Sequence, residues 1–311
     1  MTEYGYVEKA VLEWLAGRFT DPNDSGVGWK FRSAEAMEEF NRDVTDPICD
    51  GLFIPALQRA NPAVDTEEKA RKVAQAFRRA VDNPDKQEAN RRALEVLRDG
   101  LSVVLEQGSD SVTVRLIELD PTHQDRNDFT ITNQYPVNGS KTAIADSVLL
   151  VNGIPLVIAE YKSFVNSGHD WREGVKQVHR YQEEATGLLT TNVLCVAADE
   201  QELRYGTVAF AAKTEQDVRL QIDQWRPWLS AYPVERMAWN QKGNGADDDP
   251  VRKAAMSLMR PSNVLDFLEN FVVFETKRGQ TTKKIARYQQ FEAANDIVDR
   301  VLEGKQKLGL I

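Results

Sequence analysis

Apolar and polar residues alternate along this chain with two periods, one typical of helices and the other typical of strands. Apolar residues at helical spacing predict helices at about residues 6–16, after Val64, and at 84–98, 170–185, 214–228 and 285–302. Short apolar or alternating runs predict strands at 111–119, 128–133, 147–151, 154–159, 192–198 and 203–209. The order hairpin, helix, strand between residues 147 and 198 is typical of a mixed sheet with a crossover helix, so we expect an α/β fold.

The most informative segment is residues 146–162, an apolar hairpin that carries charged residues where its strands end. Asn152-Gly153 is a strong hairpin signal, and strand alternation places Glu160 and Lys162 on one face. With a two-residue turn, position 146 lies opposite position 159, and Asp146 then points away from Glu160. A three-residue loop with a left-handed Gly153, or a β-bulge, brings the two carboxylates to one face. If they form a site, we expect such an irregularity.

Two carboxylates beside a lysine suit the hydrolysis of a phosphodiester. The reaction must neutralise a phosphate, activate a water and stabilise the departing oxyanion. Asp146 and Glu160 can hold Mg²⁺, which prefers oxygen ligands and keeps several of its own waters. Lys162 can orient the attacking water or balance charge on the phosphate, and the sequence leaves both roles open. The alternative is that these are solvated charges, because 28% of the residues are charged.

The predicted helix at 170–185 follows the hairpin and carries Gln177 and Tyr181 at i and i+4, on one helix face. At this point the chain resembles the N-terminal nuclease region of the restriction (R, motor) subunit of type I restriction-modification enzymes. These belong to the PD-(D/E)xK nuclease superfamily. The resembling segments are 127–134, 145–162, 177–181, 271–274 and 284–290, and together they extend over residues 127–311.

The resemblance implies a PD-(D/E)xK restriction-endonuclease-like mixed sheet flanked by helices, with a C-terminal helical segment leading into a helicase motor that is absent here. It assigns Asp146 and Glu160 as metal ligands, Lys162 as the catalytic lysine, and Gln177 and Tyr181 as the accompanying motif. Tyr161 departs from the family, in which an aliphatic residue is usual, and we expect it to face away from the metal.

The family also often places an acidic residue of its first helix at the metal. Glu8 or Glu13 fits this position, and we take Glu8 as the candidate ligand because it adjoins the apolar stripe of the helix at 6–16. The alternative is a solvated glutamate on the helix surface.

The Gly, Asn and Asp run at 240–250 predicts a linker. We expect an endonuclease domain with N-terminal helices at 1–239 before it, and a helical connector with the start of the truncated motor at 251–311 after it. The resemblance implies cleavage of unmodified foreign DNA after ATP-driven translocation. Mg²⁺ is the implied cofactor, with ATP only in the full-length protein, where Gln289 and Gln290 would contact the nucleotide. No Gly-x-Gly-Lys-Ser/Thr loop occurs in the 311 residues, so we expect no ATP binding by this chain alone.

The implied partners are double-stranded DNA and the modification and specificity subunits. Two alternatives stay open: a PD-(D/E)xK nuclease of DNA repair, and a catalytically inactive DNA-binding or assembly module.

Charge and composition limit the partners further. A net charge of −9 argues against general affinity for nucleic acid, so DNA contacts would depend on local basic groups. The candidates are Lys176, Arg180, Lys283, Lys284 and Arg287, although a solvated linker explains the last three equally well. Two cysteines and three histidines without ligand spacing argue against zinc. No apolar run approaches the roughly 20 residues that span a bilayer, and we expect a cytoplasmic protein.

Overall fold

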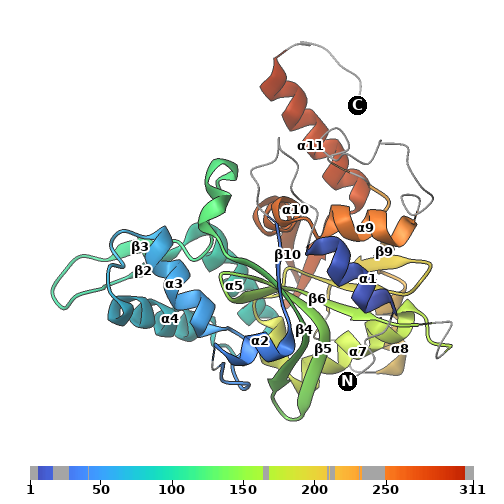
Figure 1. Cartoon of the computed structure of the whole chain (residues 1–311), viewed down its shortest axis with the longest axis horizontal. Coiled ribbons are helices and arrows are strands. Elements are labelled where there is room, and N and C mark those ends of the chain that lie inside the picture. Colours follow the sequence, from blue (N-terminus) through green and yellow to red (C-terminus); the bar gives the residue numbers. More distant parts are fainter. Residues whose placement is uncertain are drawn as a thin grey trace.

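The computed structural model describes residues 6–16, 28–40, 42–163, 168–208, 210, 214–230, 232 and 249–304. Its centre is a seven-stranded mixed sheet in the order β1-β4-β5-β6-β7-β8-β9 (Figure 1). The strands are β1 Lys30–Arg32, β4 Phe129–Asn138, β5 Thr142–Val151, β6 Ile154–Tyr161, β7 Leu194–Ala198, β8 Leu203–Gly206 and β9 Arg226–Pro227. The pairs β1/β4 and β6/β7 are parallel, and the other neighbours are antiparallel. The expected α/β class with a mixed sheet is confirmed.

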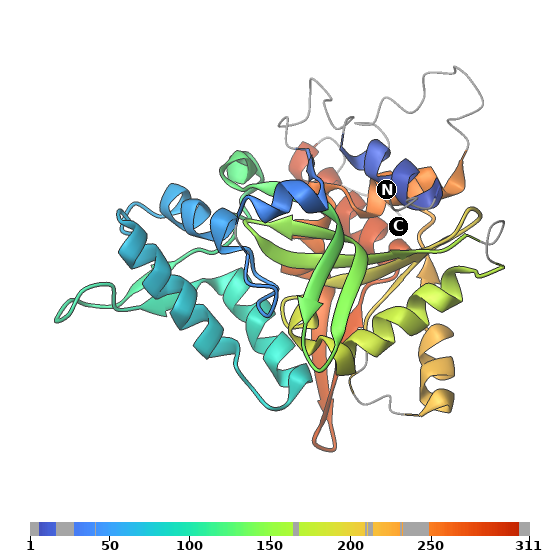
Figure 2. The ribbon, with the colours of Figure 1, turned by 60° about the horizontal axis from the view of Figure 1, so that its bottom comes forward.

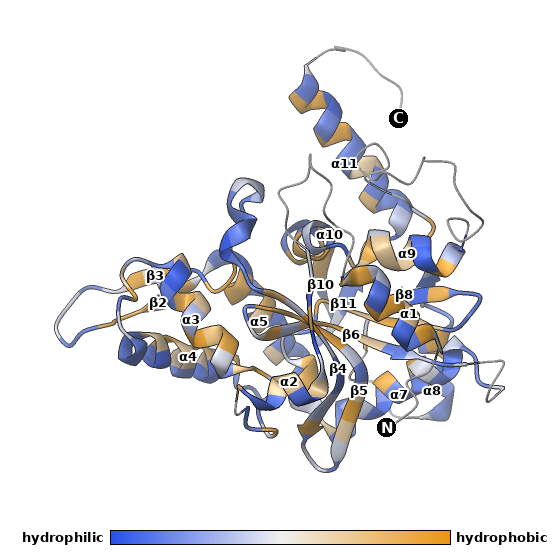
Figure 3. Ribbon diagram, in the orientation of Figure 1, coloured by the Kyte–Doolittle hydropathy of each residue, from blue (hydrophilic) through white to orange (hydrophobic). Residues whose placement is uncertain are grey.

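Helices cover both faces of the sheet. They are α1 Tyr6–Leu15, α2 Ala34–Glu38, α3 Asp50–Ala60, α4 Glu67–Val81, α5 Lys86–Asp99, α7 Trp171–Glu184, α8 Glu215–Ile222, α9 Pro250–Leu258, α10 Pro261–Asp266 and α11 Tyr288–Glu303. Short helical turns are η1 Pro121–Arg126, η2 Thr186–Leu189 and η5 Phe267–Phe271. One core layer joins α7 and α8 to the sheet, while a larger layer joins α1, α4, α5, α9 and α10 to the opposite face. The central strands are therefore largely apolar, as Figure 3 shows.

Side-chain caps set several of the helix boundaries. Thr66 accepts a hydrogen bond from the Lys69 amide at the start of α4, and Asp85 and Asp170 cap α5 and α7 in the same way. Gly100 follows α5 with a φ of +85°, a conformation that favours glycine. These helices lie within two residues of the predicted boundaries, because the caps are local signals.

Other predicted boundaries are wrong. The strand expected at 111–119 is limited to β3 Val112–Val114, which pairs with β2 Leu101–Val103. Strand β3 stops there because the side chain of Asn61 forms hydrogen bonds with both the amide and the carbonyl of Arg115. The helix expected at 214–228 ends at Ile222, and Pro227 then lies in strand β9.

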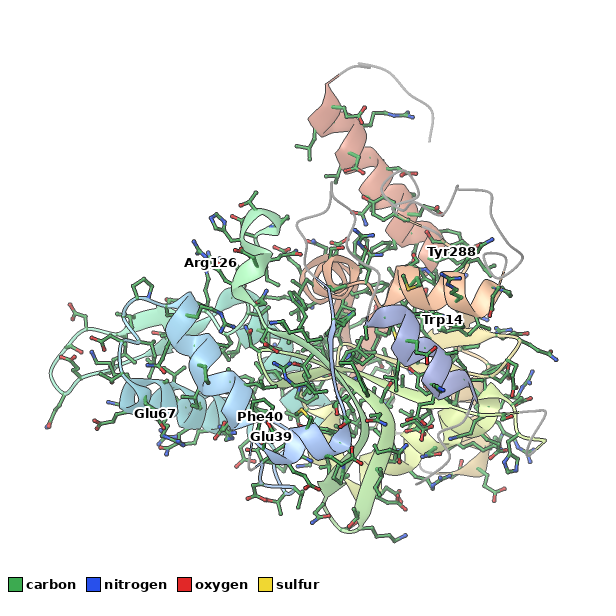
Figure 4. The ribbon with its side chains drawn as sticks, in the orientation of Figure 1. Trp14, Glu39, Phe40, Glu67, Arg126 and Tyr288 are labelled. Carbon is green, nitrogen blue, oxygen red and sulfur yellow. The ribbon has the colours of Figure 1, made fainter. Side chains whose placement is uncertain are left out.

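The segment after residue 249 is more than a helical connector. Strands β10 Val272–Lys277 and β11 Gln280–Ile285 form a hairpin, so the helix expected from 285 begins only at Tyr288. Phe267 and Phe291 stack at 4.9 Å between ring centroids and pack with Trp228. Trp14 of α1 and Tyr288 of α11, both labelled in Figure 4, border the same core. The segment thus shares a core with the sheet, and α11 projects beyond it in Figure 1.

Strand β1 and helices α2 and α3 were not predicted. Most of the predicted linker at 240–250, namely residues 240–248, lies outside the described residues. In the part that is described, no helix is both long and apolar enough to cross a membrane.

Candidate active site

The β5–β6 hairpin contains the irregularity that the site requires. Asn152 and Gly153 both have positive φ, so the turn has two residues, and Val151 pairs with Ile154 and Leu150 with Pro155. The next pair is Leu149 with Val157, which leaves Leu156 without a partner on β5. This β-bulge shifts the register by one residue, and the ladder then continues to the pair just before Asp146 and Glu160. The predicted irregularity is confirmed, as a bulge rather than a longer loop.

The carboxylates replace ladder hydrogen bonds at the point where the two strands separate. The Tyr161 amide donates to Asp146 Oδ2 at 2.8 Å, and the Asp146 amide donates to Glu160 Oε1 at 3.3 Å. Lys162 Nζ lies 3.4 Å from Asp146 Oδ2 and 3.3 Å from Glu160 Oε2. The structure therefore brings the three predicted charged residues together around one point, with both acids facing a single cation.

The site is buried on the glutamate side and open on the other. Glu160 has a fully buried side chain, whereas those of Asp146 and Lys162 remain 19% and 18% exposed. Burial, followed by the charge of Asp146, raises the pKa of Glu160 well above its ordinary value, and Lys162 opposes this rise. A bound divalent cation would relieve the same repulsion, so the donor set suits a hard metal ion with an open, hydrated side.

Tyr161 lies on the opposite face of β6, as expected. Its ring is buried in the larger core layer, and its hydroxyl is 2.9 Å from that of Ser147. The departure from an aliphatic residue is thus accommodated by a hydroxyl partner in the core.

Helix α7 reaches Glu160 through two side chains on one face. Gly174 allows the close approach, because a Cβ there would lie 3.2 Å from the Cβ atoms of Glu160 and Ala197. The Tyr181 hydroxyl donates to Glu160 Oε1 at 2.7 Å, and Gln177 Nε2 donates to that hydroxyl at 2.8 Å. Gln177 and Tyr181 share a face as predicted, and the buried Tyr181 supports Glu160.

Glu8, rather than Glu13, faces the site from α1. Glu8 is 4% exposed and accepts from Gln134 Nε2 at 3.4 Å, whereas Glu13 is exposed and pairs with Lys9. Burial and the charge of Asp146 raise the pKa of Glu8 to about 7. Within the described ranges no three Asp, Glu, His or Cys side chains gather closely enough to hold a metal ion. Glu8 therefore borders the two carboxylates without joining them in one ligand set.

Gln134 is a site residue that the sequence did not predict. It occupies the β4 position opposite Asp146 and has a φ of +47°, which is uncommon for a residue other than glycine. Before it, Phe129 and Ile131 pack in the larger core layer, and after it Tyr135 and Val137 pack in the other layer. Apolar residues stay at odd positions on both sides of this switch, so the alternation pattern carries no signal for it.

Comparison with known proteins now identifies the family. A family model described as type I restriction enzyme R protein N terminus matches residues 2–213. The chain belongs to this family. The resemblance inferred from the sequence is therefore confirmed.

Similar curated proteins carry related names. The HindI endonuclease subunit of Haemophilus influenzae is 25% identical over 92% of this chain and 27% of its own length. The putative MjaVIIIP endonuclease subunit of Methanocaldococcus jannaschii is 23% identical over 90% of this chain and 25% of its own length. The chain thus spans about a quarter of the length of these relatives.

The basic residues predicted to contact DNA do not form one strip. Lys176 and Arg180 are exposed on α7, and Lys176 pairs with Glu173 at 2.5 Å. Lys284 and Arg287 are exposed, and Lys284 pairs with Glu275. Lys283 is only 6% exposed, and its ammonium donates to the Asn192 carbonyl. The expectation that Lys283 contacts phosphate is wrong for this conformation, because strand alternation turns it inward.

The two glutamines expected at a nucleotide site lie at the start of α11. Gln289 is exposed, and Gln290 Oε1 accepts from the Arg287 amide at 2.9 Å as part of the helix cap. Their nucleotide role stays a prediction.

Proposed function

We propose that this chain is the Mg²⁺-dependent DNA endonuclease domain of a type I restriction enzyme R subunit, with a PD-(D/E)xK active site. One observation carries the proposal: the bulge at Leu156 brings Asp146 and Glu160 together beside Lys162. Membership of the R protein N-terminal family supports restriction over DNA repair as the setting.

In this proposal Asp146 and Glu160 hold the metal ion, which when bound polarises the phosphate and lowers the pKa of a coordinated water. Lys162 lies where it can orient the attacking water or neutralise the phosphate, since its ammonium already contacts both carboxylates. Tyr181 fixes the orientation of Glu160, and Gln177 fixes Tyr181. This support matters because hydrogen bonds behind a metal ligand hold it in a productive orientation.

The wider role follows from the family. The substrate would be unmodified foreign double-stranded DNA, delivered by an ATP-driven motor in the full-length protein. Modification and specificity subunits would complete the complex. Exposed Lys176, Arg180, Lys284 and Arg287 are the candidates for contacts with the DNA backbone.

The test is DNA cleavage by the full-length subunit with its partner subunits, Mg²⁺ and ATP. Asp146→Asn and Glu160→Gln should each reduce strand cleavage at least about 100-fold, because each removes a negatively charged oxygen ligand at near-constant volume. Lys141→Met is the control, since Lys141 is an exposed lysine just before β5 that pairs with Glu184. It should cleave normally.

Two results would redirect the proposal. Undiminished cleavage by Asp146→Asn would place the active site elsewhere. A wild-type complex that binds DNA and hydrolyses ATP, yet never cleaves DNA with Mg²⁺, would favour an inactive assembly module.

A further inference from the structure

The bulge residue Leu156 is held from outside its own hairpin. Its carbonyl accepts from the Val193 amide at 2.7 Å and from Asn192 Nδ2 at 3.3 Å. The neighbouring Pro155 carbonyl accepts from Thr191 Oγ1 at 2.6 Å. Three consecutive residues before β7 therefore fix the backbone that sets the register of Asp146 and Glu160.

Asn192 is itself fixed by two distant elements. It is 3% exposed, and its amide group donates to the Leu194 carbonyl at 2.7 Å as well as to Leu156. Its own carbonyl accepts from Asn90 Nδ2 of α5 at 3.0 Å and from Lys283 Nζ of β11. A continuous path of hydrogen bonds thus runs from Lys283 through Asn192 to the bulge.

The burial of Lys283 has a clear cost. Its neighbours Thr282 and Lys284 are exposed, but Lys283 lies inside, and burial lowers its pKa to about 7. Arg98 opposes its charge, and the nearby Cys195 thiol is neutral at ordinary pH because burial raises its pKa to about 12. The Asn192 carbonyl is therefore the acceptor that compensates the buried amine, which makes this contact hard to replace with water.

The β10–β11 hairpin joins this path to an exposed surface. Arg98 of α5 donates to the carbonyls of Leu268 (2.5 Å) and Val272 (2.8 Å) at the base of the hairpin. Residues 276–280 at the tip are exposed, and the orange-red hairpin projects from the body in Figure 2. A displacement of the hairpin would therefore pull on Asn192 through Lys283.

We propose that Lys283 is a positioning residue for the metal centre: by holding Asn192, it maintains the Leu156 bulge that sets Asp146 opposite Glu160. The inference rests on the proposed nuclease function and adds to it a residue outside the metal site that affects metal binding. Without the bulge, the two-residue turn would place position 146 opposite position 159, and the two carboxylates would no longer converge. The hairpin thereby influences the metal site without touching it.

The test compares Lys283→Met and Lys283→Arg with wild type, each in the full-length subunit. Mg²⁺ calorimetry and DNA cleavage are measured on each protein. We expect Lys283→Met to weaken Mg²⁺ binding and lower kcat by about tenfold each, with KM for DNA unchanged, as for other residues behind metal ligands. Lys283→Arg keeps a donor and should lose less. Lys72→Met is the control, because Lys72 also donates to a backbone carbonyl (Leu105, 3.0 Å) but is exposed on α4. It should match wild type.

Further measurements separate the alternatives. Asn192→Ala should weaken Mg²⁺ binding on its own, and adding Lys283→Met should weaken it little further, because both act through the bulge. Normal Mg²⁺ affinity in a folded Lys283→Met protein would overturn the inference, and a raised KM for DNA would show that Lys283 contacts phosphate. If Lys283→Met does not fold, full additivity of Lys283→Arg and Asn192→Ala would overturn it. A wild-type chain that binds no Mg²⁺ would instead refute the proposed function.

Discussion

Lys162 occupies the place between Asp146 and Glu160 that a metal ion would also favour. Its ammonium lies within 3.4 Å of both carboxylates. We predict that Lys162→Met abolishes cleavage but preserves or strengthens Mg²⁺ binding, because the ammonium no longer competes for the carboxylates. The loss of cleavage should be at least about 100-fold, the scale expected for a residue that moves or orients a proton. Calorimetry and cleavage on the same preparation test this, and normal cleavage would remove Lys162 from the mechanism.

The raised pKa of Glu8 predicts how the stability of the fold depends on pH. Its pKa is raised from 4.5 to about 7, so between these values the folded protein holds a proton that the unfolded chain releases. Stability should therefore fall as pH rises through this window, by up to about 3 kcal/mol. Glu8→Gln should lose the part of this slope that Glu8 causes, while the part caused by Glu160, whose pKa is also raised, remains. Urea unfolding at pH 5 and pH 8 without divalent metal is the measurement, and an unchanged slope would contradict the assigned pKa.

At the residue scale the sequence identified the charged residues that the structure brings together, but not all of their neighbours. The acids and the lysine were identifiable from their placement at strand ends. The choice of Glu8 over Glu13 rested on the apolar stripe, and burial confirms that Glu8 is the one that faces inward. Gln134 was not predictable, because its left-handed φ depends on how β4 crosses between two core layers.

At the scale of elements, the β5–β6 hairpin shows which structural features strand register predicts and which it does not. The need for an irregularity followed from strand period alone, since a two-residue turn would separate Asp146 and Glu160. Its position at Leu156 did not follow, because that depends on hydrogen bonds from residues 191–193, more than 30 positions away. Local sequence thus specified the turn, and tertiary contacts specified the bulge.

Helix α7 gives a prediction for positioning without metal contact. Gln177 donates to the Tyr181 hydroxyl, which in turn donates to Glu160. Gln177→Ala should lower kcat by roughly tenfold, while Mg²⁺ affinity stays near that of wild type. Arg180→Ala, an exposed change on the same helix, tests DNA contact instead and should raise KM. A loss of Mg²⁺ affinity in Gln177→Ala as large as in Glu160→Ala would place Gln177 in the ion site.

His179 on the same helix should make the fold sensitive to acid. It is 3% exposed, neither ring nitrogen has a hydrogen-bond partner in the described structure, and burial lowers its pKa to about 4. An unfolded histidine takes up a proton near pH 6.5, so stability is present above that value and lost as pH falls through 4. His179→Leu should retain up to about 3 kcal/mol more stability at pH 4. The exposed His169→Ala serves as the control, and an acid midpoint shared by all three proteins would contradict the prediction.

At the scale of the whole molecule, the arrangement after residue 249 was the least predictable. The stacking of Phe267 on Phe291 beside Trp228 joins this segment to the core of the sheet. No local pattern indicates that packing, because the partners are separated by up to 63 positions. The division of the chain into two parts at a linker around 240–250 therefore stays a prediction. The described part of the segment after residue 249 packs on the sheet.

The same scale gives a prediction about ATP. The 311 residues contain no Gly-rich loop with a following lysine and Ser or Thr to cradle phosphates. The chain alone should neither bind ATP nor hydrolyse it, with or without DNA. Phosphate release, measured beside the full-length subunit, tests this. ATP turnover stimulated by DNA in the 311-residue chain would contradict this prediction and reveal a nucleotide site that no sequence motif indicates.

The most direct measurement of the central claim is the position of Mn²⁺, a stand-in for Mg²⁺, located by anomalous scattering in crystals of wild-type protein and of Asp146→Asn. The account predicts one peak in direct bonding contact with carboxylate oxygens of both Asp146 and Glu160, lost or strongly reduced in the variant. A peak that does not touch Glu160, or one of equal height in Asp146→Asn, would contradict it.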